Sequence, residues 1–327
     1  MELRQLRYFI GVAEAGSLLR AAGRLHIAQP ALGQQIAALE GELMVKLFKR
    51  STRGMTLTNE GLVFLEHAKV VLMDVNRAKE SVRHTSDEPQ GEVVVGLPTT
   101  VALAATVPLL SACREKFPKV KLKVVEAYSG YLKEWLQTGR LDLAMLFGDE
   151  PDSDLVKRVL LEETLALVTP PDSKKLPQTI ALKQLKNLNL ILPAKGHGLR
   201  RIIDDACHSQ GIALQVIAEI DSLTSVKKAV ASGIGCTVLP MASVAEEVTQ
   251  GILQAATIKD NSMKRRIVCA TSVTRPTTVA SAAVINLVTE IIREMVGAGS
   301  WPGRWIGDVR TGGVVRLLLT SIRTDLQ

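Results

Sequence analysis

The sequence has few of the features that would place a protein in a membrane or outside the cell. None of its apolar runs reaches the roughly 18 residues that a transmembrane helix needs. Its first residues carry charge where a signal peptide would require an apolar run. The cysteines are scattered without a CxxC pair, as is usual in a reducing compartment, where a free cysteine serves as a small buried hydrophobe. They are Cys113, Cys207, Cys236 and Cys269. We therefore expect a cytoplasmic protein.

Motifs for catalysis and for metal binding are also missing. The five histidines show neither HxH nor HExxH spacing, which argues against a metal site. There is no GxSxG elbow for a nucleophilic serine. The segment Gly196-His197-Gly198 lacks the Lys-Ser/Thr of a phosphate-binding loop. We therefore expect no enzyme and no bound metal or cofactor.

The charge of the chain does not by itself indicate a function. Hydrophobic residues make up 46% and charged residues 22% of 327 residues, which is the composition of an ordered, soluble protein of two or three domains. A net charge of +7 is compatible with nucleic-acid binding. However, residues 1–90 hold twelve Lys and Arg against ten Asp and Glu. A DNA-binding surface would therefore depend on local clustering of basic side chains.

Three helical patterns open the chain. Apolar residues recur three and four positions apart within residues 6–13, 18–25 and 32–43. Ser17 is a candidate N-cap of the second helix, and Pro30 stands in the first turn of the third. Residues 46–58 place basic residues and a glycine between short extended pieces, which predicts a β-hairpin or wing.

The third helix has a face of small and amide side chains. Glutamine can pair with adenine and alanine can touch a thymine methyl, so this face suits reading of the major groove. It would equally serve as the solvated face of an ordinary three-helix bundle, and the basic residues of the wing would equally form a solvated loop. Spacing alone leaves these alternatives open. The candidate DNA-contacting residues are Ser17, Gln29, Pro30, Ala31, Gln34, Gln35, Arg50 and Arg53.

One long helix is predicted over residues 59–86, followed by a polar break up to residue 91. Its apolar positions follow a heptad pattern that predicts pairing of two copies in a coiled coil. A helix packed on its own domain would give much the same pattern. The positions are Leu65, Ala68, Leu72, Val75 and Val82, with Lys79 as the one polar interruption.

From residue 92 onward, short β-rich runs alternate with helical patterns. This alternation predicts an α/β domain with mixed or parallel sheets. The runs are Val93–Leu97, Leu122–Val125, Leu141–Phe147, Leu165–Val168, Leu188–Leu192, Val216–Ile220, Thr237–Leu239 and Ile267–Ala270. Residues 298–327 show no clear period, and we expect a peripheral C-terminal tail there.

Several motifs stand at fixed spacing in both parts of the chain. They are Phe9-x-x-Val12-Ala13-Glu14-x-Gly16-Ser17, Ala21-Ala22-x-x-Leu25, Gln29-Pro30-Ala31-Leu32-x-x-Gln35-Ile36-x-x-Leu39-Glu40, Leu47-Phe48-x-Arg50-x-x-Arg53, Gly139-x-Leu141-Asp142 and Gly233-x-Gly235-x-x-x-Leu239-Pro240. These motifs resemble those of the LysR-type regulators. The resemblance covers residues 1–297, and residues 26–32 and 39–43 are most similar to the nitrogen assimilation control branch. Gly33 and Met44 depart from the pattern, because the family usually has Ser and Gly at these positions.

The resemblance implies a DNA-binding transcription regulator whose activity a small-molecule co-inducer modulates. It implies a winged helix-turn-helix domain over residues 1–58 and a linker and dimerisation helix over 59–90. Residues 91–297 would form an effector domain of two lobes like a periplasmic binding protein, with lobe I at 91–160 and 266–297 and lobe II at 161–265. The implied partners are double-stranded DNA with a partly palindromic promoter site, further copies of the chain in a homodimer or homotetramer, and RNA polymerase.

The resemblance also places the effector in the cleft between the lobes. The hydroxyls at the ends of predicted strands could hold a carboxylate there, although each could instead cap a helix. No arginine is evident at these positions. Cys207 has no cysteine partner nearby in the sequence, so we expect no redox switch. The candidate effector-binding residues are Thr99, Thr100, Ser129, Phe147, His197, Leu199, Ser222 and Leu223.

Two rival interpretations stay open. A solute-binding or enzymatic α/β domain could carry the N-terminal helices without using them for DNA. A regulator could also be controlled by its own abundance and leave the cleft without a ligand.

Overall fold

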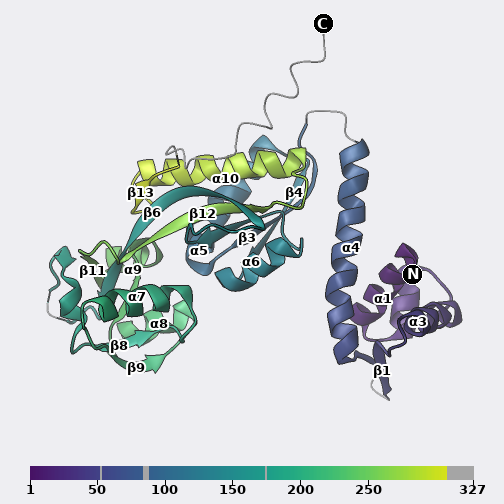
Figure 1. Cartoon of the computed structure of the whole chain (residues 1–327), viewed down its shortest axis with the longest axis horizontal. Helices are drawn as coiled ribbons and strands as arrows, with labels where there is room; N and C mark the ends of the chain where they lie inside the picture. Colours follow the sequence, from purple (N-terminus) through teal and green to yellow (C-terminus); the bar gives the residue numbers. More distant parts are fainter. Residues whose placement is uncertain (52–53, 84–87, 174, 308–327) are drawn as a thin grey trace, which may run out of the picture. The chain divides into compact units, whose positions relative to one another are not determined.

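The computed structural model of the chain describes residues 1–51, 54–83, 88–173 and 175–307. These residues form two compact units (Figure 1). The first comprises Met1–Gly91 with Thr138–Arg140, and the second comprises Glu92–Gln137 and the chain from Leu141 onward. The expected α/β class is confirmed for the second unit, and the first is rich in helix, as expected for a helix-turn-helix domain. Arg53 and residues 308–327 of the expected tail lie outside the described residues.

The first unit is a small helical domain with a two-stranded hairpin. Phe9 lies at its centre, with ring centroids 5.2 Å from Phe48 and 5.0 Å from Phe64. The apolar stripes of the three predicted helices meet around it, because each helix buries the face that its periodicity marks. The elements are α1 Leu3–Ala15, α2 Leu18–Leu25, α3 Gln29–Leu43, β1 Phe48–Ser51, β2 Gly54–Leu57 and α4 Asn59–Arg83.

Three helices of this unit end in a left-handed residue, α2 at His26 with φ 53° and the other two at Gly16 and Met44. The end of α1 is Gly16 at φ 60°, where glycine carries no steric penalty. The end of α3 is Met44 at φ 53°, although a Cβ makes this conformation unfavourable. The departure from glycine at Met44 therefore leaves the geometry of the helix end unchanged.

Glu40 joins α3 to the hairpin. Its carboxylate is buried, pairs with the Lys46 ammonium at 2.8 Å and accepts the backbone N–H groups of Leu47 and Phe48 at 2.9 and 3.2 Å. Burial raises the pKa of Glu40, but these hydrogen bonds to the charged form outweigh burial and leave the pKa below its ordinary value. The ionised carboxylate thus sets where the hairpin leaves the third helix.

The heptad positions of α4 pack on their own domain. Ala68 is fully inside the core of the first unit, and Leu65 and Leu72 pack against that core. Ala68 therefore follows the alternative to the coiled coil, while Leu65 and Leu72 are half-buried and keep part of their surface exposed. Other apolar side chains of α4 are exposed instead, with 53% of Leu62 and 62% of Val63 accessible to solvent.

The second unit is built on a mixed sheet with the strand order β4-β3-β5-β12-β6-β11-β7 in the described residues. Strands β10 and β13 also pair with β6, and a separate parallel pair is formed by β8 and β9. The strands are β3 Gly91–Leu97, β4 Val120–Glu126, β5 Leu143–Phe147, β6 Leu155–Thr169, β7 Thr179–Ile180, β8 Asn189–Leu192, β9 Gln215–Glu219, β10 Thr237–Pro240, β11 Gln254–Ile258, β12 Lys264–Ser272 and β13 Arg304–Trp305. The helices are α5 Thr99–Lys116, α6 Ser129–Gln137, η1 Leu182–Leu185, α7 Gly198–Ser209, α8 Leu223–Ala231, η2 Met241–Ser243, α9 Ala245–Thr249 and α10 Val279–Gly297.

Two separate hydrophobic cores divide this unit into lobes. One core lies between β3, β5 and the helices α5 and α10, and the other between β8, β10, α7 and α8. Strand β6 belongs to both, since Leu161 is in the first core and Leu165 in the second. The lobes therefore meet along β6.

A buried ion pair lies at this junction. Arg265 and Glu163 face each other on β12 and β6, and their side chains pair directly. Glu163 also accepts a hydrogen bond of 3.1 Å from the indole N–H of Trp301, and both Glu163 and Trp301 are 1% exposed. The predicted tail therefore begins with residues that pack on lobe I, and Trp301 could not be placed from a segment without periodicity.

Gly33 offers a test of the local energetics of α3. It lies inside the helix, and a Cβ there would meet no atom within 4 Å. We expect Gly33→Ala to raise the free energy of unfolding by about 1 kcal/mol, because glycine loses more backbone entropy in a helix. The matched Gly16→Ala variant should lower it by about 1–2 kcal/mol at its left-handed position. Thermal unfolding of both variants measures the change in stability relative to the wild type. A Gly33→Ala variant that is less stable than the wild type would show that the added Cβ is not accommodated.

The buried ion pair gives a second prediction. Glu163→Gln leaves the Arg265 charge without its counter-ion, and we expect a loss of about 3–5 kcal/mol in urea unfolding. The double variant Glu163→Gln with Arg265→Gln should recover most of that loss, because no buried charge remains. Arg266→Gln, on the same strand with its side chain 46% exposed, is the control and should cost at most about 1 kcal/mol. Equal losses of stability in Glu163→Gln and Arg266→Gln would show that leaving the buried Arg265 charge unpaired costs no more than changing an exposed arginine.

Candidate functional site

The face of α3 that the sequence marks is exposed in the first unit. Gln29 and Pro30 are its first two residues, and both are exposed together with Ala31 and Gln34. Gln35 is half-buried beside them. Amide and small side chains therefore gather at the N-terminal end of the helix, where the dipole and the unpaired N–H groups favour a phosphate.

The other candidate DNA contacts lie on neighbouring elements. Ser17 caps α2, since its hydroxyl accepts the backbone N–H of Arg20 at 3.5 Å. Arg50 is exposed on β1, opposite Met55 of β2. The structure brings Arg50 onto the hairpin that follows α3, and the placement of Arg53 is not described.

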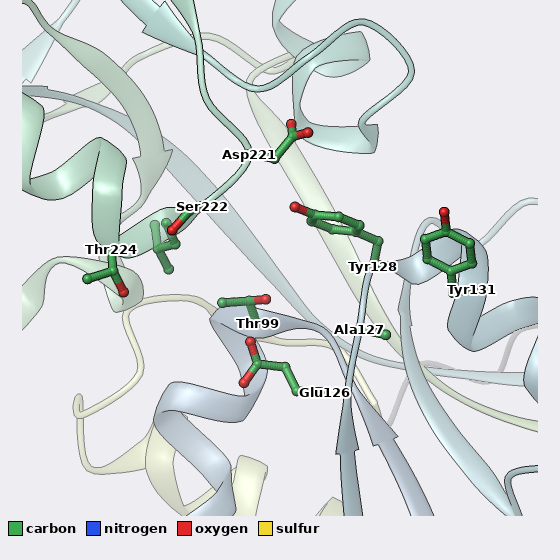
Figure 2. Close-up of a pocket in the computed structure, with 9 residues that line it drawn as sticks. Thr99, Glu126, Ala127, Tyr128, Tyr131, Asp221, Ser222 and Thr224 are labelled. Atoms are coloured by element: carbon green, nitrogen blue, oxygen red, sulfur yellow. The ribbon is translucent and has the colours of Figure 1, made fainter. Parts of the chain in front are cut away.

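The second unit has a cavity of about 430 Å³ between its lobes. Lobe I contributes residues at the start of α5, at the end of β4 and around the start of α6, and lobe II contributes the turn that enters α8. Figure 2 shows the side chains of both groups, with the Tyr128 ring between Asp221 and Thr99 in this view. The lining residues are Thr99, Glu126, Ala127, Tyr128, Tyr131, Asp221, Ser222, Leu223 and Thr224.

Three of the predicted effector residues line this cavity: Thr99, Ser222 and Leu223. Ser222 is also the N-cap of α8, and its hydroxyl accepts the N–H of Ser225 at 3.3 Å. The helix-cap alternative and a role at the cavity are thus both compatible with its position. Thr99 is the first residue of α5.

Thr100 and Phe147 lie beside an arginine that the sequence did not reveal. The Arg265 guanidinium donates to the Thr100 hydroxyl at 2.8 Å and lies over the Phe147 ring at 3.9 Å from its centroid. Contrary to expectation, a guanidinium therefore contacts two of the predicted cleft positions. In the sequence, Arg265 stands before the predicted strand Ile267–Ala270, in a run of basic residues that is typical of a solvated segment. Its position near the cleft becomes apparent only from the pairing of β12 with β6.

The remaining predicted residues divide between the cleft and the core. His197 is the N-cap of α7 and makes an edge-to-face contact with Tyr128, with ring centroids 5.3 Å apart. The Ser129 hydroxyl is buried and has no hydrogen-bond partner among the described residues. Leu199 is 4% exposed in the core of lobe II, so its side chain is not brought to the cavity.

The cavity includes residues that the sequence prediction did not select. Glu126 and Tyr131 are exposed there, although nothing in their spacing marks them. Asp221 is also exposed, and it accepts the backbone N–H of Ala194 at 2.9 Å, which holds its carboxylate in place. The sequence does point to Tyr128 and Asp221, because both lie just after predicted strands, at the ends where α/β sheets bind ligands.

Two ionisable groups at the cleft stay neutral. Burial lowers the pKa of His197, and the nearby Arg265 charge lowers it further, while Asp221 acts in the opposite direction. The neutral imidazole accepts the Leu199 N–H at Nδ1 (3.1 Å). Burial raises the pKa of Tyr128, as does the carboxylate of Asp221, so its hydroxyl is a neutral donor.

The thiols offer little redox chemistry. Burial raises the pKa of Cys207 to about 11, with smaller contributions from Asp204 and Asp260. Burial likewise raises the pKa of Cys269 to about 12. The reactive thiolate is therefore scarce at neutral pH at both positions.

Across residues 1–51, 54–83, 88–173 and 175–307, no three His, Cys, Asp or Glu side chains gather into a potential metal site. No helix within these ranges is both long and apolar enough to cross a membrane.

Two family models match the chain. The model described as bacterial regulatory helix-turn-helix protein, lysR family, matches residues 3–62. The model described as LysR substrate binding domain matches residues 86–293. The two matches therefore fall on the helical unit and on the two-lobed unit.

Full-length regulators are similar over most of the chain. The nitrogen assimilation regulatory protein nac of Klebsiella aerogenes is 38% identical over 73% of this chain and 78% of its own. The transcriptional regulator BbuR of Bordetella bronchiseptica is 34% identical over 91% and 92%. The crystal structure of full-length CbnR complexed with its target DNA is 26% identical with a TM-score of 0.70, covering 90% of this chain and 99% of that one.

Proposed function

The chain belongs to the LysR family of DNA-binding transcription regulators, and from this premise we propose that α3 reads base edges in the major groove while the cavity between the lobes takes the effector. The observation that carries the first part is the exposed face of α3. Gln29, Ala31 and Gln34 are exposed on this face, as side chains that read bases must be. The family consists of regulators, so the enzymatic alternative is set aside.

The cellular setting and partners follow from the same premise. We propose that the protein acts in the cytoplasm, where bacterial DNA is accessible. The DNA-bound CbnR relative supports a double-stranded promoter site as partner. Arg50, exposed on the hairpin, is proposed to neutralise a phosphate, and Arg53 is proposed to contact the backbone or minor groove. Contact with RNA polymerase is part of the same proposal.

Base reading predicts a loss of specificity when α3 is changed. Gln34→Ala or Gln35→Ala should weaken binding to the target site by about 1–3 kcal/mol and leave binding to random DNA unchanged. The reason is that base contacts add specificity, while phosphate contacts hold any sequence. Gel shifts over a salt series measure both affinities, since a phosphate-dependent complex weakens log-linearly with salt.

The matched control is Gln215→Ala, an exposed glutamine on β9 of the other unit. It should bind target and random DNA as the wild type does. If Gln34→Ala and Gln35→Ala weakened both DNAs equally, the face of α3 would have no base-reading role.

Pairing of two copies is proposed to use the outward face of α4. Leu65, Ala68 and Leu72 pack on the core of their own domain, so they are not part of the proposed seam. Leu62 and Val63 are apolar and exposed on the same helix. Covering them with a second copy removes that apolar surface from water.

We therefore expect Leu62→Asp with Val63→Asp to weaken self-association at least about tenfold, because a buried unpaired charge is strongly unfavourable. Analytical ultracentrifugation measures the dissociation constant. Leu65→Ala is the control: it should lower the melting temperature, since it removes packing within the domain, and leave association unchanged. A double variant that associates like the wild type would place the dimer contact elsewhere.

A further inference from the structure

The charged groups that face the interlobe cavity are acidic. The nine described residues that line it include Glu126 and Asp221 and no Lys, Arg or His. Glu126 ends β4 in lobe I, and Asp221 follows β9 in lobe II, so the two negative charges approach the cavity from opposite lobes. Both are exposed. A ligand entering the cavity therefore meets negative charge on two sides.

Aromatic rings form a further part of the lining. Tyr128 is 41% and Tyr131 is 56% exposed. The Tyr128 ring contacts His197, and the Tyr131 ring stacks on Trp135. Both tyrosines line the cavity (Figure 2). The face of a tyrosine ring attracts a cation through its quadrupole. Carboxylates together with tyrosine rings are therefore a chemically consistent set for a positively charged ligand.

The nearby positive charge does not reverse this conclusion. Arg265 is 5% exposed, and its guanidinium is taken up by Glu163, Thr100 and the Phe147 ring. None of these four residues lines the cavity. Its charge is matched by the buried Glu163 carboxylate beside it, and the imidazole of His197 is neutral. The unmatched charge open to a ligand is that of the two exposed carboxylates.

We propose that the effector is an organic cation, an amine or a quaternary ammonium compound small enough for a cavity of about 430 Å³. This inference rests on the proposed function of the cavity as the effector site and names its ligand class. The cationic head lies between Glu126 and Asp221 against the tyrosine rings. The hydroxyls of Thr99 and Thr224 are available to polar groups of the ligand.

The same arrangement supplies a mechanism of response. With the cavity empty, two carboxylates on opposite lobes repel each other, and closing the lobes would bring them closer. A bound cation attracts both and so binds the closed form more tightly than the open form. Differential affinity of this kind is what shifts a conformational equilibrium.

The experiment uses the full chain and two pairs of probes in isothermal titration calorimetry. Choline is compared with neohexyl alcohol, which has the same shape without the charge. Putrescine is compared with succinate, which has the same chain length and the opposite charge. We expect the two cations to bind and their partners to bind at least about tenfold more weakly, the difference that a charged contact supplies.

Variants then assign the site. Asp221→Asn removes the charge but keeps an oxygen that can accept the Ala194 N–H. Glu126→Gln removes the charge in lobe I. Each should weaken binding of the cations about tenfold. Asp172→Asn, at an exposed aspartate of lobe II outside the cavity, should leave it unchanged. The proposal is overturned if neither cation binds the wild type, if succinate binds better than putrescine, or if both cavity variants bind as the wild type.

Gel shifts on the same proteins keep this result separate from the proposed function. If the wild-type protein bound target DNA but no cation, the proposed DNA-reading function would stand and the proposal of a cationic effector would be rejected. Protein that binds the cations at Asp221 and Glu126 but shows no specific DNA binding would uphold the ligand class and remove the DNA-reading role.

Discussion

The pairing of Arg265 with Glu163 determines how the two-lobed unit is joined. These residues face each other on β12 and β6, between a core that contains Leu161 and a core that contains Leu165. A charge in such a place is costly unless its partner is held in position, and here the β-ladder and the Trp301 indole hold it. The segment after α10 is thereby tied to lobe I, because it supplies the indole that completes the carboxylate's hydrogen bonds.

The same ion pair determines which charges the cleft presents. Because Glu163 holds the guanidinium of Arg265 away from solvent, that charge stabilises Thr100 and Phe147 without reaching the cavity. The exposed Glu126 and Asp221 are left as the charges that a ligand meets. An arginine close to a cleft is therefore not enough to predict an anionic ligand, since burial and pairing decide whether its charge is available.

The helical unit depends on burial of a carboxylate in a comparable way. Glu40 connects the end of α3 to the hairpin through Lys46 and two backbone N–H groups. The helix proposed to read bases and the hairpin that carries Arg50 therefore have a common anchor. The face of α3 with Gln34 stays free for another molecule, because the opposite face with Leu32 and Leu39 forms the core.

The sequence by itself determined the local structure and the family. The apolar periodicity of α1 to α4 and the eight β-rich runs reflect backbone preferences and burial of one face, which a single segment already specifies. The signature around Gln29 and Pro30 indicated the LysR family before any contact was known. Long-range pairings were not accessible in this way: the strand segment with Glu162 and Glu163 reads as charged and solvated until Arg265 and Trp301 are brought against it. Only the tertiary structure decided that Leu65 and Leu72 pack on their own domain, because a periodic apolar stripe shows that a face is buried but not which surface covers it. Only the tertiary structure likewise decided that Glu126 and Asp221 share one cavity, because residues 95 positions apart carry no sign in the sequence that they are close in space.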